Sequence, residues 1–192
     1  TLIPRPDTEL LVQLALERIA EQAAPTILDL GTGTGAIALA LAKERSDASV
    51  LALDKSNAAL VVAKRNQQRL GVTNLKLLAS DWFSALPKNV RFDLIVSNPP
   101  YIPEADPHLS QGDVRFEPRS ALSSGLSGLD DLSYLIHTAP HYLAAKGWLL
   151  LEHGYDQGWA VTELLKTTGY TEVACYQDLA GNDRVSRGRW SS

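Results

Sequence analysis

The chain has 192 residues, of which 45% are hydrophobic and 21% charged, and its formal net charge is −4. This composition is typical of one globular domain, and no apolar run approaches the roughly 18–20 residues that a membrane span needs. Proteins that bind bare nucleic acid usually carry an excess of basic residues, so the acidic balance argues against DNA or RNA as a direct ligand.

Apolar periodicity and turn residues predict an alternation of helices and strands along the chain. The predicted helices cover residues 7–23, 36–44, 58–70, 129–145 and 159–167, and Pro140 is expected to interrupt the fourth of them. The predicted strands cover residues 26–30, 50–53, 75–79, 92–97, 148–152, 171–176 and 184–190. Residues 102–128 lack periodicity and are predicted to form a long loop. This alternation predicts a mostly parallel sheet with helices on both faces.

A glycine-rich turn follows the first predicted strand directly after Asp29 and Leu30. Glycines let a backbone turn sharply and approach a ligand closely, and the helix that follows adds free N–H groups. The spacing is G-x-G-x-G, whereas a nicotinamide-binding turn would read G-x-G-x-x-G. We expect this turn to bind a cofactor, and the alternative is a plain strand-to-helix turn. The residues concerned are Gly31, Thr32, Gly33, Thr34 and Gly35.

Carboxylates and one aromatic residue end the next two predicted strands. Asp54 is placed to accept both hydroxyls of a ribose, or else it caps the following helix. Asp81 is placed to accept an adenine amino group and Trp82 to cover the ring, or else Trp82 and Phe83 plug the end of the sheet. The carboxyl edge of an open α/β sheet is where ligands bind, so we assign Asp54, Asp81 and Trp82 to the cofactor.

The sequence Asn98-Pro99-Pro100-Tyr101 follows the predicted strand 92–97 directly. Each proline fixes its own φ at about −65° and restrains the residue before it, so this corner is stiff. The Asn98 side-chain oxygen and the Pro99 carbonyl then form a fixed pair of acceptors for a planar NH₂ group, with Tyr101 as a flat wall. We expect group transfer onto an amide or amino nitrogen. Asn98, Pro99 and Tyr101 are the predicted catalytic residues, Pro100 is a further substrate contact, and Asn98 also faces the reactive end of the cofactor. The alternative is a turn that merely ends a strand.

The remaining residues with reactive side chains predict no second site. His137 and His141 lack an accompanying Glu, so we expect no metal. No nucleophile elbow is present, which argues against a hydrolase. Surface or loop positions are predicted for His108 and His153, and a solvated strand edge for the basic cluster of Arg184, Arg187 and Arg189.

With these motifs in hand, the chain resembles the release factor glutamine methyltransferases, which use S-adenosylmethionine. The opening Pro-Arg-Pro-Asp-Thr-Glu at residues 4–9 and the Asp-Leu-Ala-Gly-Asn-Asp-Arg at residues 178–184 are the most specific parts of the match. The other matching segments are 29–37, Asp54, 81–83, 97–102, 116–118 and 150–154.

The resemblance implies a Rossmann-like methyltransferase fold with a mostly parallel seven-stranded sheet, one antiparallel strand and helices on both faces. The antiparallel seventh strand would lie between the fifth and sixth. The implied substrate is the glutamine of the Gly-Gly-Gln loop of peptide chain release factors. The implied products are N5-methylglutamine and S-adenosylhomocysteine.

We expect residues 1–192 to be one catalytic domain. The chain starts at Thr1 and contains no Met, so we expect it to lack its natural amino terminus and the helical substrate-docking domain of the family. The lone Cys175 and the lack of a signal-peptide pattern predict a cytoplasmic protein without membrane contact, and we expect a monomer.

Three other functions fit parts of the pattern. A methyltransferase that acts on adenine or guanine amino groups would use the same acceptor pair, but it would need a basic, aromatic groove. A nicotinamide oxidoreductase would need the wider glycine spacing. A non-catalytic cofactor-binding module would not need the Asn98–Tyr101 corner.

Overall fold

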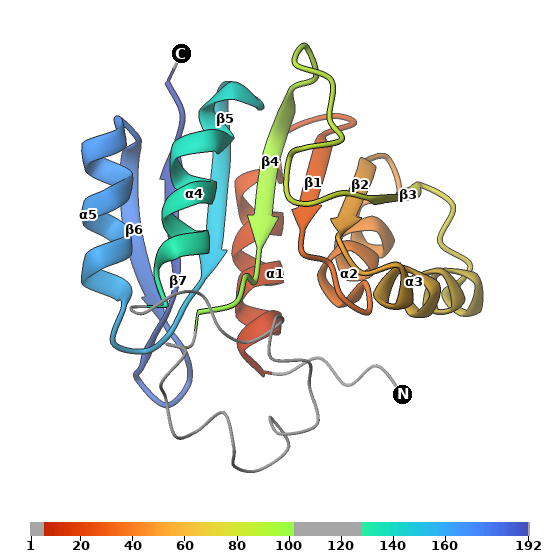
Figure 1. Cartoon of the computed structure of the whole chain (residues 1–192), viewed down its shortest axis with the longest axis horizontal. Helices are drawn as coiled ribbons and strands as arrows, with labels where there is room; N and C mark the ends of the chain where they lie inside the picture. The colour runs from red at the N-terminus through yellow and green to blue at the C-terminus, as the bar shows by residue number, and fades with distance from the viewer. Residues whose placement is uncertain (1–5, 102–127, 192) are drawn as a thin grey trace.

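The structure is a computed structural model that describes residues 6–101 and 128–191. Its centre is one seven-stranded sheet with the order β3-β2-β1-β4-β5-β7-β6 (Figure 1). All pairs from β3 to β5 are parallel, whereas β7 is antiparallel to both of its neighbours. This arrangement confirms the predicted Rossmann-like fold, including the seventh strand between the fifth and sixth.

The strands cover Thr26–Leu30 (β1), Ser49–Asp54 (β2), Leu75–Ala79 (β3), Phe92–Ser97 (β4), Leu143–Glu152 (β5), Thr171–Gln177 (β6) and Asp183–Arg189 (β7). The helices cover Pro6–Arg18 (α1), Ala36–Glu44 (α2), Asn57–Leu70 (α3), Asp130–Thr138 (α4) and Gly158–Thr168 (α5), with a 3₁₀ turn at Ala139–His141 (η4). No helix within the described ranges combines the length and apolar character that crossing a bilayer requires.

Two apolar layers sandwich the sheet because successive side chains of a strand point to opposite faces. Ile27 of β1 lies in the layer with α1 and α2, and its neighbour Leu28 lies in the layer with α4 and α5. Leu94 and Ile95 of β4 divide in the same way. Figure 1 shows α4 and α5 in front of the sheet and α1 behind it. The predicted helices on both faces are confirmed.

The predicted helix 129–145 is wrong at its carboxyl end. α4 stops at Thr138, Pro140 lies in the short 3₁₀ turn, and Leu143 already pairs with Phe92 as the start of β5. Leu143, Ala144 and Ala145 favour a helix locally, but pairing with the neighbouring strand overrides this weak preference. The first helix also ends earlier than predicted, at Arg18 instead of residue 23. The predicted loop falls, except for Gly128, outside the described residues.

The basic cluster near the carboxyl end does not form a solvated strand edge, because β7 is an interior strand of the sheet. The Arg187 guanidinium lies over the rings of Trp148 and Tyr176, at 4.8 and 5.4 Å from their centroids. Arg189 pairs with Glu172 at 2.6 Å. Arg187 and Arg189 therefore contact side chains of the neighbouring strands β5 and β6, which corrects the sequence-based expectation.

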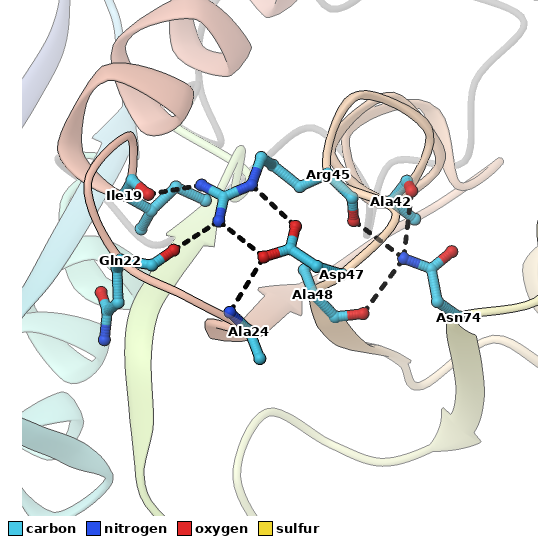
Figure 2. Close-up of polar contacts among 8 residues, drawn as sticks. All are labelled: Ile19, Gln22, Ala24, Ala42, Arg45, Asp47, Ala48 and Asn74. Atoms are coloured by element: carbon cyan, nitrogen blue, oxygen red, sulfur yellow. Dashed lines mark hydrogen bonds and ion pairs between the residues drawn. The ribbon is translucent and has the colours of Figure 1, made fainter.

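A polar network joins three connections at the amino edge of the sheet (Figure 2). The Arg45 guanidinium donates to the backbone carbonyl of Ile19 and to the Asp47 carboxylate, which in turn accepts the Ala24 N–H at 2.9 Å. The Asn74 amide donates at 3.0–3.1 Å to three backbone carbonyls, that of Ala42 in the last turn of α2 and those of Arg45 and Ala48 in the α2–β2 connection. These contacts fix the edge opposite to the predicted site.

Candidate cofactor and amide-binding site

The sheet register brings the ends of β1, β2 and β4 to one level. Leu30 pairs with Leu53 on one side and with Ser97 on the other, so Gly31, Asp54 and Asn98 are the next residues along three adjacent strands. The Ser97 hydroxyl donates to the Leu30 carbonyl at 2.7 Å and locks β4 to β1 at this point. The chain passes from β1 outward to β3 and then returns to β4 on the other side of β1, which makes this edge the topological switch point where open α/β sheets bind ligands.

The glycine turn adopts left-handed backbone conformations that other residues rarely adopt. Gly31 and Gly35 have φ values of 70° and 85°. A side chain on Gly35 would also crowd Leu39 and Ala63, since an added Cβ would lie 3.1 and 3.2 Å from their side-chain carbons. The turn is therefore packed closely against α2 and α3, and its backbone lies at the switch point.

Asp54 is tied to the glycine turn. Its Oδ2 accepts the Gly33 N–H and its Oδ1 accepts the Ser56 N–H, both at 2.8 Å. The N-cap of α3 is Ser56, whose hydroxyl accepts the Ala59 N–H, so the alternative that Asp54 itself caps this helix is wrong. A carboxylate has about four acceptor positions, so two remain for ligand hydroxyls.

Asp29 was not predicted as a site residue, although it lies only two residues before Gly31, the first residue of the turn. Its Oδ2 accepts the Thr32 hydroxyl at 2.6 Å and the Ala38 N–H at 3.2 Å. Its Oδ1 is buried and has no hydrogen-bond partner among the described residues. Burial raises the pKa of this carboxyl to about 7, against the lowering effect of its two donors. A buried, unpaired carboxylate oxygen beside a ligand-binding turn fits a cationic group of the ligand. The sequence signal was present: an acidic residue within an apolar strand is unusual.

Asp81 and Trp82 follow β3 and were both predicted to contact the adenine, but the structure places them differently. Asp81 is exposed, and the half-buried Trp82 lies beside Gly31: a Cβ added there would be 3.3 Å from the indole ring. The indole N–H donates to Asp131 of α4 at 3.2 Å. Phe83 is buried and stacks on Tyr142, with ring centroids 4.7 Å apart. Phe83 therefore plugs the sheet end, whereas Trp82 borders the glycine turn.

The Asn98–Tyr101 corner lies beside the glycine turn. The half-buried Asn98 side chain makes no hydrogen bond to another described residue. Pro99 is buried, and the Tyr101 ring packs against the apolar layer of α4 and α5. Within residues 6–101 and 128–191, the Asn98 carboxamide is thus without a hydrogen-bond partner, and it lies next to the point where a ligand on the turn would end.

His153 lies in the loop after β5, as the predicted loop position allowed, but it is fully buried, so a surface position is wrong. It follows β5, where its Nε2 lies 2.8 Å from the Ser186 hydroxyl and its Nδ1 lies 2.9 Å from the Gly154 carbonyl. Burial lowers the pKa of this imidazole. The sequence around His153 gave no sign of β7 as a neighbour, because that pairing joins segments far apart in the chain. His108 lies outside the described residues.

The strand order arranges the predicted residues in a row. Asp81 follows β3, Asp54 follows β2, the glycine turn follows β1 and Asn98 follows β4, which are adjacent strands in that order. An elongated ligand along this edge would place its base, its ribose and its reactive end in sequence. Among residues 6–101 and 128–191, no three His, Cys, Asp or Glu side chains are grouped as metal ligands.

Comparisons with known proteins agree with this geometry. The methyltransferase small domain family matches residues 7–112. A protein of Pseudomonas aeruginosa named release factor glutamine methyltransferase is 58% identical over 191 residues, which span 100% of this chain and 68% of that protein. Its namesake from Escherichia coli is 53% identical over 190 residues, 99% of this chain and 68% of that protein.

Solved structures show the same likeness. A release factor-specific protein-(glutamine-N5) methyltransferase from Alicyclobacillus acidocaldarius matches with a TM-score of 0.61 and 28% identity, over 100% of this chain and 96% of that chain. A methyltransferase from Pyrococcus furiosus matches with a TM-score of 0.72 at 20% identity, over 100% of this chain and 85% of that chain, which shows a common fold.

Proposed function

Because this chain belongs to the release factor glutamine methyltransferases, we propose that the row of residues along its sheet edge carries out methyl transfer to a glutamine side chain. The chain acts on the side-chain amide nitrogen, N5, of the Gly-Gly-Gln glutamine in peptide chain release factors. The observation that carries the proposed residue roles is the Asn98 carboxamide, which has no partner among the described residues and lies one strand away from the glycine turn.

The methyl donor in this proposal is S-adenosylmethionine, which supplies an electrophilic methyl group on a positively charged sulfur. The residues present fit it. Asp54 would accept the ribose hydroxyls, Trp82 would border the adenine and Asp81 would accept its amino group. The Oδ1 of Asp29, which has no partner among the described residues, would accept a hydrogen bond from the cationic amino group of the methionine part. Gly31, Thr32, Gly33, Thr34 and Gly35 form the backbone surface against which the donor lies.

The acceptor nitrogen needs orientation more than activation. An amide nitrogen is a poor nucleophile because its lone pair is delocalised into the carbonyl group. The Asn98 side-chain oxygen and the Pro99 carbonyl would accept the two N–H groups of the substrate glutamine and so fix the direction of the nitrogen. Alignment of this kind can lower a barrier by ~7–11 kcal/mol.

The prolines explain why the acceptor pair holds its shape. Neither Pro99 nor Pro100 has a backbone N–H, and each has a fixed φ, so the corner has few alternative conformations. Tyr101 would pack on the amide plane and limit its rotation. No side chain is assigned as a strong general base, and the amide proton would pass to water after transfer.

Family membership decides between the functions that the sequence left open. Methylation of adenine or guanine amino groups would use the same corner, but the relatives from Pseudomonas aeruginosa and Escherichia coli, both more than 50% identical, are named for release factor glutamine. The G-x-G-x-G spacing of the turn does not fit a nicotinamide oxidoreductase. We further propose that the chain is a monomeric, cytoplasmic catalytic domain without direct nucleic acid contact, and light scattering tests the first point.

The decisive test is transfer of a labelled methyl group. The chain would be incubated with methyl-labelled S-adenosylmethionine and a purified release factor, and the product mapped by mass spectrometry. We expect one methyl group on the glutamine of the Gly-Gly-Gln loop and none on a release factor with that glutamine changed to Ala. Label on another residue, or on added RNA only, would refute the proposal.

A further inference from the structure

The Asn98–Tyr101 corner is anchored by a hydrogen bond at each end. The bond at the carboxyl end comes from Gln157, a residue that no sequence motif indicated. On its amino side the Ser97 hydroxyl donates to the Leu30 carbonyl at 2.7 Å. On its carboxyl side the side-chain Nε2 of Gln157 donates to the Tyr101 carbonyl at 3.0 Å. Asn98 lies between these two fixed points.

Gln157 is itself rigidly placed. It is only 7% exposed, and its Oε1 accepts the Gly154 N–H at 2.9 Å. It immediately precedes α5, whose first residue, Gly158, lies so close to β7 that an added Cβ would be 2.5 Å from the Asp183 carboxylate. Both the oxygen and the nitrogen of the Gln157 amide are therefore hydrogen-bonded, and the next residue, Gly158, packs closely against Asp183 of β7.

Gly128, which precedes α4, also lies against the Tyr101 carbonyl and the Gln157 amide. Gly128, with φ of 72°, is packed so tightly that an added Cβ would lie 2.2 Å from the Tyr101 carbonyl oxygen and 2.9 Å from the Gln157 Nε2. Three segments that are distant in sequence thus meet at one carbonyl: the end of the corner, the residues before α4 and the turn before α5. The Gln157 amide therefore holds this carbonyl by a hydrogen bond, and the close approach of Gly128 restricts its movement.

We propose that Gln157 is a positioning residue for methyl transfer: by holding the Tyr101 carbonyl it sets the orientation of the acceptor pair at Asn98 and Pro99. Prolines stiffen each residue of the corner but cannot anchor it, because Pro99 and Pro100 have no N–H to donate. This inference rests on the proposed role of Asn98. Gln157 touches neither the substrate amide nor the methyl group in this scheme.

Two variants of Gln157 distinguish the effect of its N–H donor from the effect of the rest of its side chain. Gln157→Glu keeps the shape and the acceptor for Gly154 but, when ionised, loses the donor to Tyr101, whereas Gln157→Met removes both contacts. We expect kcat for release factor methylation to fall on the order of 10- to 100-fold in both. The affinity for S-adenosylhomocysteine, measured by calorimetry, should stay at the wild-type value.

The chain offers a matched control in Gln67. It is 5% exposed, its Nε2 donates to the Leu75 carbonyl at 2.7 Å and its Oε1 accepts from Lys64 at 3.0 Å. It joins α3 to β3 and does not touch the corner. Gln67→Met should lower Tm as Gln157→Met does, yet leave kcat unchanged at a temperature where both variants are folded.

A second readout does not depend on activity. Hydrogen exchange by mass spectrometry should show faster exchange in peptides that contain Asn98 and Tyr101 in Gln157→Met but not in Gln67→Met. Equal kcat in the Gln157 and Gln67 variants would overturn the inference while the proposed function stands. If the wild-type chain methylated no release factor, the proposed function would fail, and unchanged exchange at the corner would then overturn the inference on its own.

Discussion

At the scale of single residues, the Asn98 carboxamide stands out because it has no partner in the described part of the chain, whereas its neighbours are firmly held. A half-buried amide without hydrogen bonds is costly unless a ligand or water completes it. Asn98 directly follows β4 at the proposed site, where the NH₂ group of a bound substrate can donate to its side-chain oxygen.

Replacing Asn98 by Ala tests this directly. We expect kcat to fall by about 10²-fold or more, since half of the acceptor pair is lost and a misplaced nitrogen reacts slowly. The calorimetric affinity for S-adenosylhomocysteine should change little, because Asn98 contacts only the reactive end. Near wild-type turnover in this variant, measured with labelled donor, would rule out the acceptor pair.

We expect Asp29 to make the affinity for the cofactor depend on pH. Because its pKa is about 7, the Asp29 carboxyl of the ligand-free protein is largely protonated at pH 6 and becomes ionised as the pH rises above 7. A cationic ligand group favours the ionised form, so binding below pH 7 must first release a proton and is weakened. Between pH 7.5 and pH 6 we expect the Kd for S-adenosylhomocysteine to rise roughly tenfold, measured by calorimetry.

The matched variant for this test is Asp29→Asn, which keeps the shape but cannot ionise. Its affinity should be low at both pH values, with the pH dependence removed. If wild type and Asp29→Asn responded alike to pH, the titrating group would lie elsewhere.

At the scale of elements, the two edges of the sheet have different tasks. The carboxyl edge carries the residues that we propose bind the ligands, whereas the network around Arg45 and Asn74 ties the connections of the amino edge together (Figure 2). Asn74 joins the start of β3 to the end of α2 and the α2–β2 connection through three carbonyl acceptors. This edge should therefore govern stability without affecting chemistry.

Asn74→Asp puts a carboxylate against three carbonyl oxygens and removes the donor. We expect a loss of about 1–3 kcal/mol in the free energy of unfolding, and a fall in Tm of about 2–10 °C for a domain of this size. Gln68→Glu makes the same charge change at an exposed position of α3 and should leave Tm unchanged. Methylation kcat, assayed well below Tm, should match wild type in both. A reduced kcat in Asn74→Asp would mean that the two edges are coupled.

At the scale of the whole molecule, the switch in strand order creates the binding edge. β1 and β4 are neighbours in the sheet although β2 and β3 come between them along the chain, and the glycine turn and the Asn98–Tyr101 corner follow their carboxyl ends side by side. A ligand that spans β3 to β4 would tie four strands together and stabilise the native state.

Cofactor product should therefore raise the melting temperature of the chain. At a free concentration of about 100 times its Kd, S-adenosylhomocysteine should stabilise the fold by ~2.7 kcal/mol, which corresponds to about 5–10 °C in Tm. Asp54→Ala should reduce this shift at the same concentration, since the ribose contact is lost. A scanning calorimeter that showed no shift for the wild type would contradict a cofactor site on this edge.

The sequence by itself determined most of the local structure and the character of the site. The bounds of β1, α2, β3 and β4 were predicted to the residue, because glycines, prolines and apolar runs mark their ends locally. The glycine turn, Asp54 and Asn98 were placed at one sheet edge for the same reason.

Only the tertiary structure decided which distant groups meet. Leu143 joined a strand despite a helix-favouring segment, His153 became buried through β7, and Gln157 reached the Tyr101 carbonyl across the fold. Contacts of this kind depend on which strands become neighbours, and no local pattern of residues encodes them. The sequence therefore indicates the chemistry of the site, and the packing of distant segments determines how firmly that site is held.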